Sequence, residues 1–361
     1  MAFALPVWLA VQEELLQQEE ADCGTSSCFD SLDDEALFDM FHLTRPCIAF
    51  IVDAVRLRMK KHATKRPVHS VDTMVMVALN YYAHGMCSTA VLQRLGLDHV
   101  NYPMNIVSKV SGVIAGMSDQ FISFPLCAEA RSSLASKMEK SCGIPGVLGV
   151  LAPAHFKIRV SPYERQTFKS FLNTQGYTSV VSQMIFDSDG NIMSVEKCTV
   201  GGTCEQEMWD SSLKGREMEE DVHGPFWVIG GKGYRQSKHV LTPLLSPTSD
   251  SEFRFNEAHA KIYEVIRTTL GTMKRRFKCL LQLGFAEQGS LSKKSNIIKS
   301  CCVLHNIAKK FSVAPPPVAG KIEPFNPVKQ PLVPAEIHPE AQKARQELIE
   351  ANFSDVSSSQ D

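Results

Sequence analysis

The spacing of apolar residues changes near residue 143, and the change separates two structural classes. Before it, apolar side chains recur every three to four residues, the spacing of amphipathic helices. Segment 70–85 is the clearest case, because Ser70 suits an N-cap and Gly85 suits the end of a helix. Ser31, three residues before an acid, suits the cap of an earlier helix. The pattern predicts an all-α region at 30–142.

Two short helical stretches, 88–97 and 103–117, are separated by the polar segment DHVNY. Two helices around a tight turn match the outline of a helix-turn-helix, whose second helix enters the major groove of DNA. A plain helical bundle would show the same spacing, so both interpretations stay open. We expect a helix-turn-helix-like N-terminal domain.

After residue 143 the pattern is one of short strands followed by helices. Asp189-Gly190 between two apolar runs is a strong hairpin signal. Strands in a run with helices packed on them are typical of a layered α/β domain. The expected elements are strands in 143–158, in two parts of 178–200 and in 226–231, and helices in 204–215, 256–280, 293–311 and 339–353.

These patterns divide the chain into five segments. A Pro-rich stretch with little secondary-structure signal reads as a linker, and a last amphipathic helix follows it. The expected segments are 1–29 (a leading segment with an amphipathic helix), 30–142 (helical domain), 143–312 (α/β domain), 313–338 (linker) and 339–361 (helix and tail).

Composition narrows the classes of function without choosing one. The 361 residues carry a net charge of −1, which argues against a globally basic nucleic-acid binder and leaves room for local basic patches. The 11 cysteines are scattered and include no CxxC pair, so we expect reduced thiols of an intracellular protein. The apolar stretch at the N-terminus lacks a basic start and is too short to span a membrane.

Basic residues cluster in two places, and each cluster has two interpretations. The segment RLRMKKHATKR holds six bases, and KRRFK follows Arg267 on a predicted helix where Arg267, Lys274 and Lys278 share one line. Both clusters suit phosphate contact and, equally, a solvated helix face. The DNA-binding candidates are Arg56, Arg58, Lys60, Lys61, Lys65, Arg66, Lys109, Arg267, Lys274, Arg275, Arg276 and Lys278.

The strand GVLAPAHFKI, residues 149–158, is built like the approach to a catalytic site but lacks an acid. The only polar side chain beside Ala152-Pro153-Ala154 is His155. A histidine without carboxylate partners is more often structural than a base or metal ligand, and we expect that role for His155 and His305. No P-loop, dinucleotide fingerprint or Cys/His metal spacing occurs.

Several motifs in this sequence resemble one known family. GIPGVLGV, LTPLLSP, FRFNEAHA, RRFKCL and above all CCVLHNI occur in order, with QFISFP before them and ARQELIEANFS after them. They are similar to the Harbinger transposase-derived nuclease family and its PIF/Harbinger transposase relatives, over about residues 30–354. The resemblance implies an RNase H-like mixed sheet of five strands flanked by helices, behind the helical N-terminal domain.

The resemblance also implies a DDE mechanism, in which three acids hold two Mg²⁺ or Mn²⁺ ions for phosphodiester displacement. In this sequence the three acid positions correspond to Ala152, Gly231 and Arg267. Ala and Gly cannot bind a metal, and Arg carries the opposite charge. The sequence therefore predicts no catalytic residues, no metal site and no cofactor.

Neighbouring acids are the remaining route to a metal site. Glu264 lies one turn before Arg267, and Asp187 lies at the predicted hairpin, where Asp is also expected for structural reasons. They are the fallback metal candidates. Glu205, Glu207 and Asp210 mark a short helix and do not reproduce the placement of the three acids.

The predicted function is that of a domesticated Harbinger-transposase-derived protein without nuclease activity. The resemblance implies a Myb-like (SANT or trihelix) partner, location in the nucleus and cytoplasm, and possible binding of DNA, and we expect no membrane association. Arg267 replacing an acid would suit direct contact with a phosphate. The alternatives are a metal-dependent nuclease with relocated ligands and an interaction scaffold that no longer binds nucleic acid.

Overall fold

The computed structural model describes residues 32–62, 69–97, 100–284, 290–317 and 338–354. These residues fall into two compact units that are discontinuous in sequence. The helical unit combines residues up to 121 with 275–281 and 296–317, and the sheet unit combines 122–274, 282–295 and the segment after 317. The units divide the chain at other positions than the predicted boundaries 143 and 312.

The helical unit contains no strand in the residues described. Its elements are α2 (Asp34–Phe41), α3 (Arg45–His62), α4 (Val71–His84), α5 (Thr89–Arg94), α6 (Pro103–Ala115), α7 (Ser118–Phe121), η3 (Lys278–Leu281) and most of α12 (Leu291–Lys310).

The caps of α4 confirm the sequence prediction. The Ser70 side chain accepts from the Thr73 N–H at 3.1 Å, and Gly85 adopts a φ of 78° at the other end. In α2 the cap is Asp33, whose carboxylate accepts from the Ala36 N–H at 2.7 Å. The prediction of Ser31 as cap is therefore wrong, and Ser31 itself lies outside the described residues. The helix-turn-helix over α5 and α6 stays a prediction.

The sheet unit holds a mixed sheet of six strands. Its elements are α8 (Ala128–Cys142), β1 (Val147–Lys157), η1 (Pro162–Glu164), η2 (Lys169–Phe171), β2 (Ser179–Phe186), β3 (Ile192–Val195), β4 (Thr199–Val200), α9 (Glu205–Ser211), α10 (Leu213–Glu219), β5 (Trp227–Ile229), β6 (Val240–Leu241), most of α11 (Asp250–Arg276) and α13 (Pro339–Phe353).

The strand order is β3-β2-β1-β5-β6, and the short β4 also pairs with β2. β1 is antiparallel to β2 and parallel to β5, and β5 is parallel to β6. This mixed arrangement is consistent with the DDE and RNase H-like superfamily. The predicted first strand, the hairpin at Asp189-Gly190, the strand β5 and the last helix are confirmed. The second strand of the hairpin, predicted to run to residue 200, is divided into β3 and β4, and β6 was not predicted.

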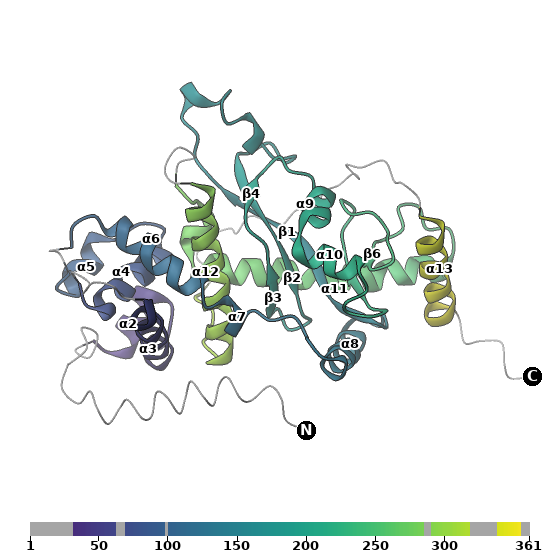
Figure 1. Ribbon diagram of the computed structural model, residues 1–361, viewed down its shortest axis with the longest axis horizontal. Helices are drawn as coiled ribbons and strands as arrows, with labels where there is room; N and C mark the ends of the chain where they lie inside the picture. The colour runs from purple at the N-terminus through teal and green to yellow at the C-terminus, as the bar shows by residue number, and fades with distance from the viewer. Residues whose placement is uncertain (1–31, 63–68, 98–99, 285–289, 318–337, 355–361) are drawn as a thin grey trace, which may run out of the picture. The chain divides into compact units, whose positions relative to one another are not determined.

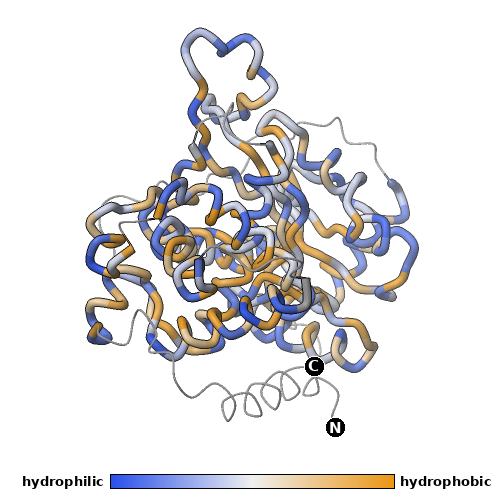
Figure 2. The backbone as a smooth tube through the Cα atoms, turned by 60° about the vertical axis from the view of Figure 1, so that its left-hand side comes forward, coloured by the Kyte–Doolittle hydropathy of each residue, from blue (hydrophilic) through white to orange (hydrophobic). Residues whose placement is uncertain are grey.

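Helices cover both faces of this sheet. Figure 1 shows α11 behind the sheet and α9 and α10 in front of it. Trp209 of α9 and Met218 of α10 pack in a buried cluster with Leu148, Ile185 and Val228 of the strands. α11 buries its stripe Ile262, Ile266, Leu270 and Met273, as its spacing predicts. The strands are accordingly apolar in Figure 2.

Some sequence predictions concern residues outside the structure described. These are the leading helix within 1–29 and most of the Pro-rich segment 313–338. No helix among the described residues has the length and apolar character needed to cross a membrane. The cysteines in the same residues are free thiols.

Candidate functional site

The positions expected to hold catalytic acids lie at one edge of the two central parallel strands. Val150 of β1 is in register with Ile229, the last residue of β5. Ala152 lies two residues further along β1, and Gly231 lies two residues past the end of β5. Carboxyl ends of parallel strands are a common place for a catalytic site. Ala152 is completely buried and still within β1, which continues to Lys157 beside β2 alone.

Tyr263 of α11 fills the space beside Leu151 of β1 and Gly231, which follows β5. Its hydroxyl lies 3.5 Å from the Leu151 carbonyl oxygen, to which it donates. A Cβ atom built on Gly231 would lie 2.7 Å from the Tyr263 hydroxyl oxygen and 3.2 Å from Cζ. Real Cβ atoms essentially never approach so closely, so any side chain at residue 231 would compete with Tyr263 for this space.

A histidine one turn earlier in α11 fixes the helix against the same strand end. His259 Nε2 donates to the Gly230 carbonyl oxygen at 2.9 Å, and its ring stacks on that of Tyr263 with centroids 5.7 Å apart. Burial lowers the pKa of His259 to about 4. The ring is therefore neutral at neutral pH and serves packing.

One buried acid, Glu205, lies close to these groups. Its carboxylate contacts Gly233 where a Cβ would stand, and burial raises the pKa of Glu205 to about 7. Tyr234 donates to the Gln183 side-chain oxygen at 3.1 Å, and burial raises the pKa values of Tyr234 and Tyr263 well above the usual range, with the Glu205 charge contributing. A single carboxylate among tyrosines is not a metal-binding set.

Arg267 and the fallback ligand Glu264 form an ion pair on the surface of α11. Their side chains are 58% and 51% exposed, and the Arg267 guanidinium donates to the Glu264 carboxylate. Glu264 is thus already engaged by the residue that replaces the third acid. A pair this exposed contributes little to stability.

The second fallback ligand, Asp187, is a structural residue of the β2–β3 turn. Its buried carboxylate accepts from the backbone N–H groups of Asp189 at 2.9 Å and Asn191 at 2.8 Å. The Asn191 side chain donates to it at 2.7 Å, and Lys137 Nζ lies 3.4 Å away. These partners already satisfy the carboxylate, and the turn explains why an Asp stands there.

The side chains present do not fit the two-metal centre of an active relative. The three expected positions hold a methyl group, a hydrogen and an exposed guanidinium, and Tyr263 takes up space between the strands and α11. Within the described ranges no group of three His, Cys, Asp or Glu side chains could hold a metal ion. Hard divalent ions need several oxygen ligands together.

His155 is held by the fold, and its ring contacts a hydroxyl group. Its Nδ1 lies 3.0 Å from Ser179 Oγ, and Lys274 Nζ donates to the His155 carbonyl oxygen at 3.5 Å. Burial, followed by the charge of Lys274, lowers the pKa of His155 to about 4. Lys274 also lies 5.9 Å from the Phe156 ring centroid, so this DNA-binding candidate is half-buried against β1. His305 is buried in α12.

The basic run at the end of α11 does not form the surface that the sequence predicted. Arg276 is buried and donates to the carbonyl oxygens of His42, of Val313 at 2.8 Å and of Ala314 at 3.2 Å. Its role is to satisfy backbone groups of the helical unit, so its assignment to DNA binding is wrong. Burial lowers the pKa of Arg276 to about 10.

Two neighbours of Arg276 also differ from the prediction. The helix ends at Arg276, so Lys278 lies in η3 and cannot continue the line of Arg267 and Lys274 along α11. Lys278 is exposed, and Arg275 is half-buried. The sequence carries no Gly or Pro near the C-terminal end of α11, so the apolar pattern predicted a helix that continues to residue 280.

The other basic cluster lies on α3 and is partly engaged within the protein. Arg56 pairs with Asp53 and with Asp72 at 2.6 Å, and Arg58 donates to the Gly116 carbonyl oxygen at 2.8 Å. Lys60 and Lys109 are exposed. Lys65 and Arg66 lie outside the described residues, as does the side chain of Lys61. Their proposed contacts with phosphate stay predictions.

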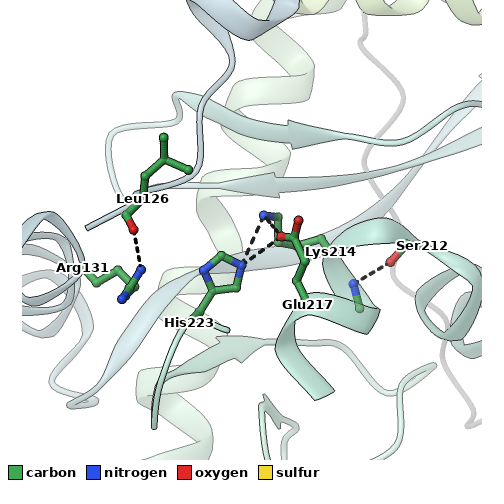
Figure 3. A network of polar contacts seen from close by, with 7 residues as sticks. Leu126, Arg131, Ser212, Lys214, Glu217 and His223 are labelled. Carbon is green, nitrogen blue, oxygen red and sulfur yellow. Dashed lines mark hydrogen bonds and ion pairs between the residues drawn. The ribbon is translucent and has the colours of Figure 1, made fainter. Parts of the chain in front are cut away.

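A buried histidine network in the sheet unit was missed by sequence reasoning. His223 Nε2 lies 3.0 Å from a Glu217 carboxylate oxygen, which Lys214 also contacts. Figure 3 shows these three side chains together. His223 packs on Phe124 with ring centroids 4.9 Å apart. Burial lowers the pKa of His223, and no hydrogen-bond partner for its Nδ1 is present in the described residues. No spacing rule joins a loop histidine to a helix, so no sequence pattern could have predicted this contact.

Comparisons with known proteins decide the family. A family model described as a DDE superfamily endonuclease matches residues 154–306. HARBI1 of Rattus norvegicus, named as a candidate nuclease, is 30% identical over 327 residues, which cover 90% of this chain and 92% of the relative. The chain belongs to the Harbinger transposase-derived nuclease family.

Other members of this family extend the comparison. Human HARBI1 is 29% identical over 328 residues, with 90% of this chain and 92% of the relative covered. An Arabidopsis thaliana protein named antagonist of like heterochromatin protein 1 is 22% identical over 327 residues, which cover 81% of this chain and 80% of the relative. No solved structure matches.

Proposed function

We propose that this Harbinger-derived protein has no nuclease activity and acts by binding DNA or a Myb-like protein partner in the nucleus and cytoplasm. The absence of nuclease activity rests on a single observation, which concerns the catalytic edge formed by Ala152, Gly231 and the adjoining Tyr263. Ala152 within β1 and Gly231 just after β5 are not acids, and the Tyr263 hydroxyl occupies the place a side chain at residue 231 would need. An acid at that position would require Tyr263 to move.

Charge supports the same conclusion. Two divalent ions close together require several carboxylates to neutralise them. Arg267 adds a positive charge on α11, and its partner Glu264 is committed to it. Glu205 is buried and protonates near pH 7. The catalytic edge therefore offers no cluster of negative charge.

A binding role is supported by what the chain retains. The fold is still that of a family of nucleic-acid enzymes, and Lys60, Lys109 and Lys278 of the helical unit are exposed. The name of the Arabidopsis relative describes antagonism of a heterochromatin protein. That name supports a chromatin-associated protein partner for this chain. A Myb-like partner rests on the family resemblance.

A cleavage assay on the full chain tests the loss of activity. Supercoiled plasmid and labelled oligonucleotide are incubated with Mg²⁺ or Mn²⁺ and the purified protein, with Asp187→Asn and Glu264→Gln variants alongside. We expect no cleavage above the metal-only control. Cleavage that disappears in either variant would overturn the proposal in favour of a nuclease with relocated ligands.

A second measurement tests the binding role. DNA affinity is measured as a function of salt concentration, because each phosphate contact contributes to the slope of log K against log salt. A clear negative slope supports DNA binding. A slope near zero would leave the chain as a protein-interaction scaffold.

A further inference from the structure

A polar arm projects from the sheet unit between its first two strands. It comprises residues 158–178, which include η1 and η2, and it extends beyond the body of the unit at the top of Figures 1 and 2. Neither the catalytic edge nor the predicted DNA-binding residues include any part of it. The arm carries Arg159, Arg165 and Lys169 against a single acid, Glu164.

The arm is built by its own hydrogen bonds. Asn173 accepts on its side-chain oxygen from the N–H groups of Gln175 at 3.0 Å and Tyr177 at 3.3 Å, and it donates to Ser179 Oγ at 3.1 Å. Phe168 and Phe171 pack with ring centroids 5.5 Å apart. These contacts give the arm a defined conformation.

The base of the arm is also tied to the sheet unit. The Ile158 N–H donates to the Thr178 carbonyl oxygen at 3.1 Å, and the Thr178 hydroxyl donates to the Ile158 carbonyl oxygen at 2.9 Å. The Arg159 N–H donates to the Gly284 carbonyl oxygen at 2.8 Å. Gly202 donates to the Ser170 carbonyl oxygen at 2.9 Å, and a Cβ at Gly202 would lie only 2.7 Å from that oxygen. The close approach of these two segments explains a glycine at residue 202.

This ordered arm exposes groups that do nothing for the fold. The Tyr163 side chain is 98% exposed, although a large aromatic ring normally gains stability by burial. Arg165 and Lys169 are exposed near it in sequence, on either side of the turn from η1 to η2. A solvated aromatic ring among cations is the arrangement that proteins use to bind single-stranded nucleic acid, by base stacking and phosphate attraction.

We propose that the arm binds a single nucleic-acid strand, with Tyr163 stacking on a base and Arg165 and Lys169 contacting phosphates. This inference deepens the nucleic-acid part of the proposed function and does not depend on the loss of cleavage. Stacking requires an unpaired base, so the arm favours single strands over duplex. An acidic peptide would use the cations but would give no base for Tyr163 to stack on.

Fluorescence anisotropy of the full chain with a labelled mixed-sequence single strand tests the arm. We expect Tyr163→Ala to weaken binding by about tenfold and Tyr163→Phe, which keeps the ring, to bind like the wild type. The double change Arg165→Glu and Lys169→Glu should weaken binding and lower the salt slope by about 1.4, the value for two phosphate contacts on a single strand. The same strand annealed to its complement should bind more weakly.

The matched control is Lys140→Glu with Lys343→Glu, which changes net charge equally on exposed faces of α8 and α13. This control should leave affinity nearly unchanged, and melting temperatures verify that every variant is folded. Unchanged affinity in Tyr163→Ala, equal loss in the control pair, or binding to duplex alone would overturn the proposal. Because the assay uses no divalent metal, its outcome is separate from the cleavage test.

Discussion

The β2–β3 turn contains a buried acid, whereas the expected acid positions in β1 and just after β5 contain none. At the turn, the buried Asp187 carboxylate receives two backbone N–H groups and the Asn191 side chain. On β1 and just after β5, Ala152 and Gly231 have no ionisable group, and Tyr263 contacts the Leu151 carbonyl oxygen and lies against Gly231. The sheet therefore retains a carboxylate whose partner is its own backbone and lacks those whose partner would be a metal ion.

The largest expected effect is at the turn. Asp187→Ala leaves buried N–H donors without an acceptor, so we expect the free energy of unfolding to fall by about 3 kcal/mol in urea titrations. Asp187→Asn keeps one acceptor oxygen and should cost about 1 kcal/mol. A loss below about 0.5 kcal/mol for the alanine variant would contradict a structural role for this acid.

Even a methyl group at residue 231, just after β5, should destabilise the protein. Gly231→Ala brings a Cβ into the Tyr263 hydroxyl, and we expect a cost of about 2 kcal/mol in unfolding free energy. Tyr263→Phe removes the nearest atom, so the same substitution should cost less in that background. A double-mutant cycle measures this coupling, expected at about 1 kcal/mol. Additive costs would show that Tyr263 does not occupy the place of a side chain at residue 231.

Sequence patterns predicted the backbone of this region better than its side-chain contacts. β1, the hairpin and α13 follow from local signals: an apolar run, Asp189-Gly190 and an amphipathic period. The contact of Tyr263 with Gly231 joins residues 32 positions apart and leaves no local signal. Arg276 illustrates the same limit. Its place in a run of basic residues does not predict that it is buried and donates to three backbone carbonyl oxygens.

A third prediction concerns pH and the buried acid beside Tyr263. Burial raises the pKa of Glu205 from 4.5 to about 7, so the folded state binds a proton that the unfolded state has lost between these values. Stability is fully present below pH 4.5 and falls as pH rises through 7. Glu205→Gln should remove this loss and be more stable than wild type at pH 8 by up to about 2 kcal/mol.

Urea titrations at pH 5 and pH 8 measure this difference. Tyr263→Phe serves as a control that keeps the carboxylate in place and should retain the fall in stability between the two values. An equal difference between pH 5 and pH 8 in wild type and Glu205→Gln would show that this carboxylate is not the group responsible.

The smallest effect is expected at Arg267, the third position where an acid was expected. Arg267 and Glu264 are both more than half exposed, so Arg267→Ala should leave the melting temperature nearly unchanged. Differential scanning calorimetry of this variant, beside Glu264→Ala, measures the effect. A larger loss would assign the pair a structural role and weaken the contrast with Asp187.

We expect no metal ion to bind at Ala152, Gly231 and Arg267, the three positions where acids were expected. Titration of the wild-type chain with Mn²⁺, followed by electron paramagnetic resonance of the free ion, tests it most directly, with Asp187→Asn and Glu264→Gln as reference variants. We predict no saturable binding and identical curves for all three proteins. A saturable Mn²⁺ site in the wild type that weakens in either variant would contradict the account.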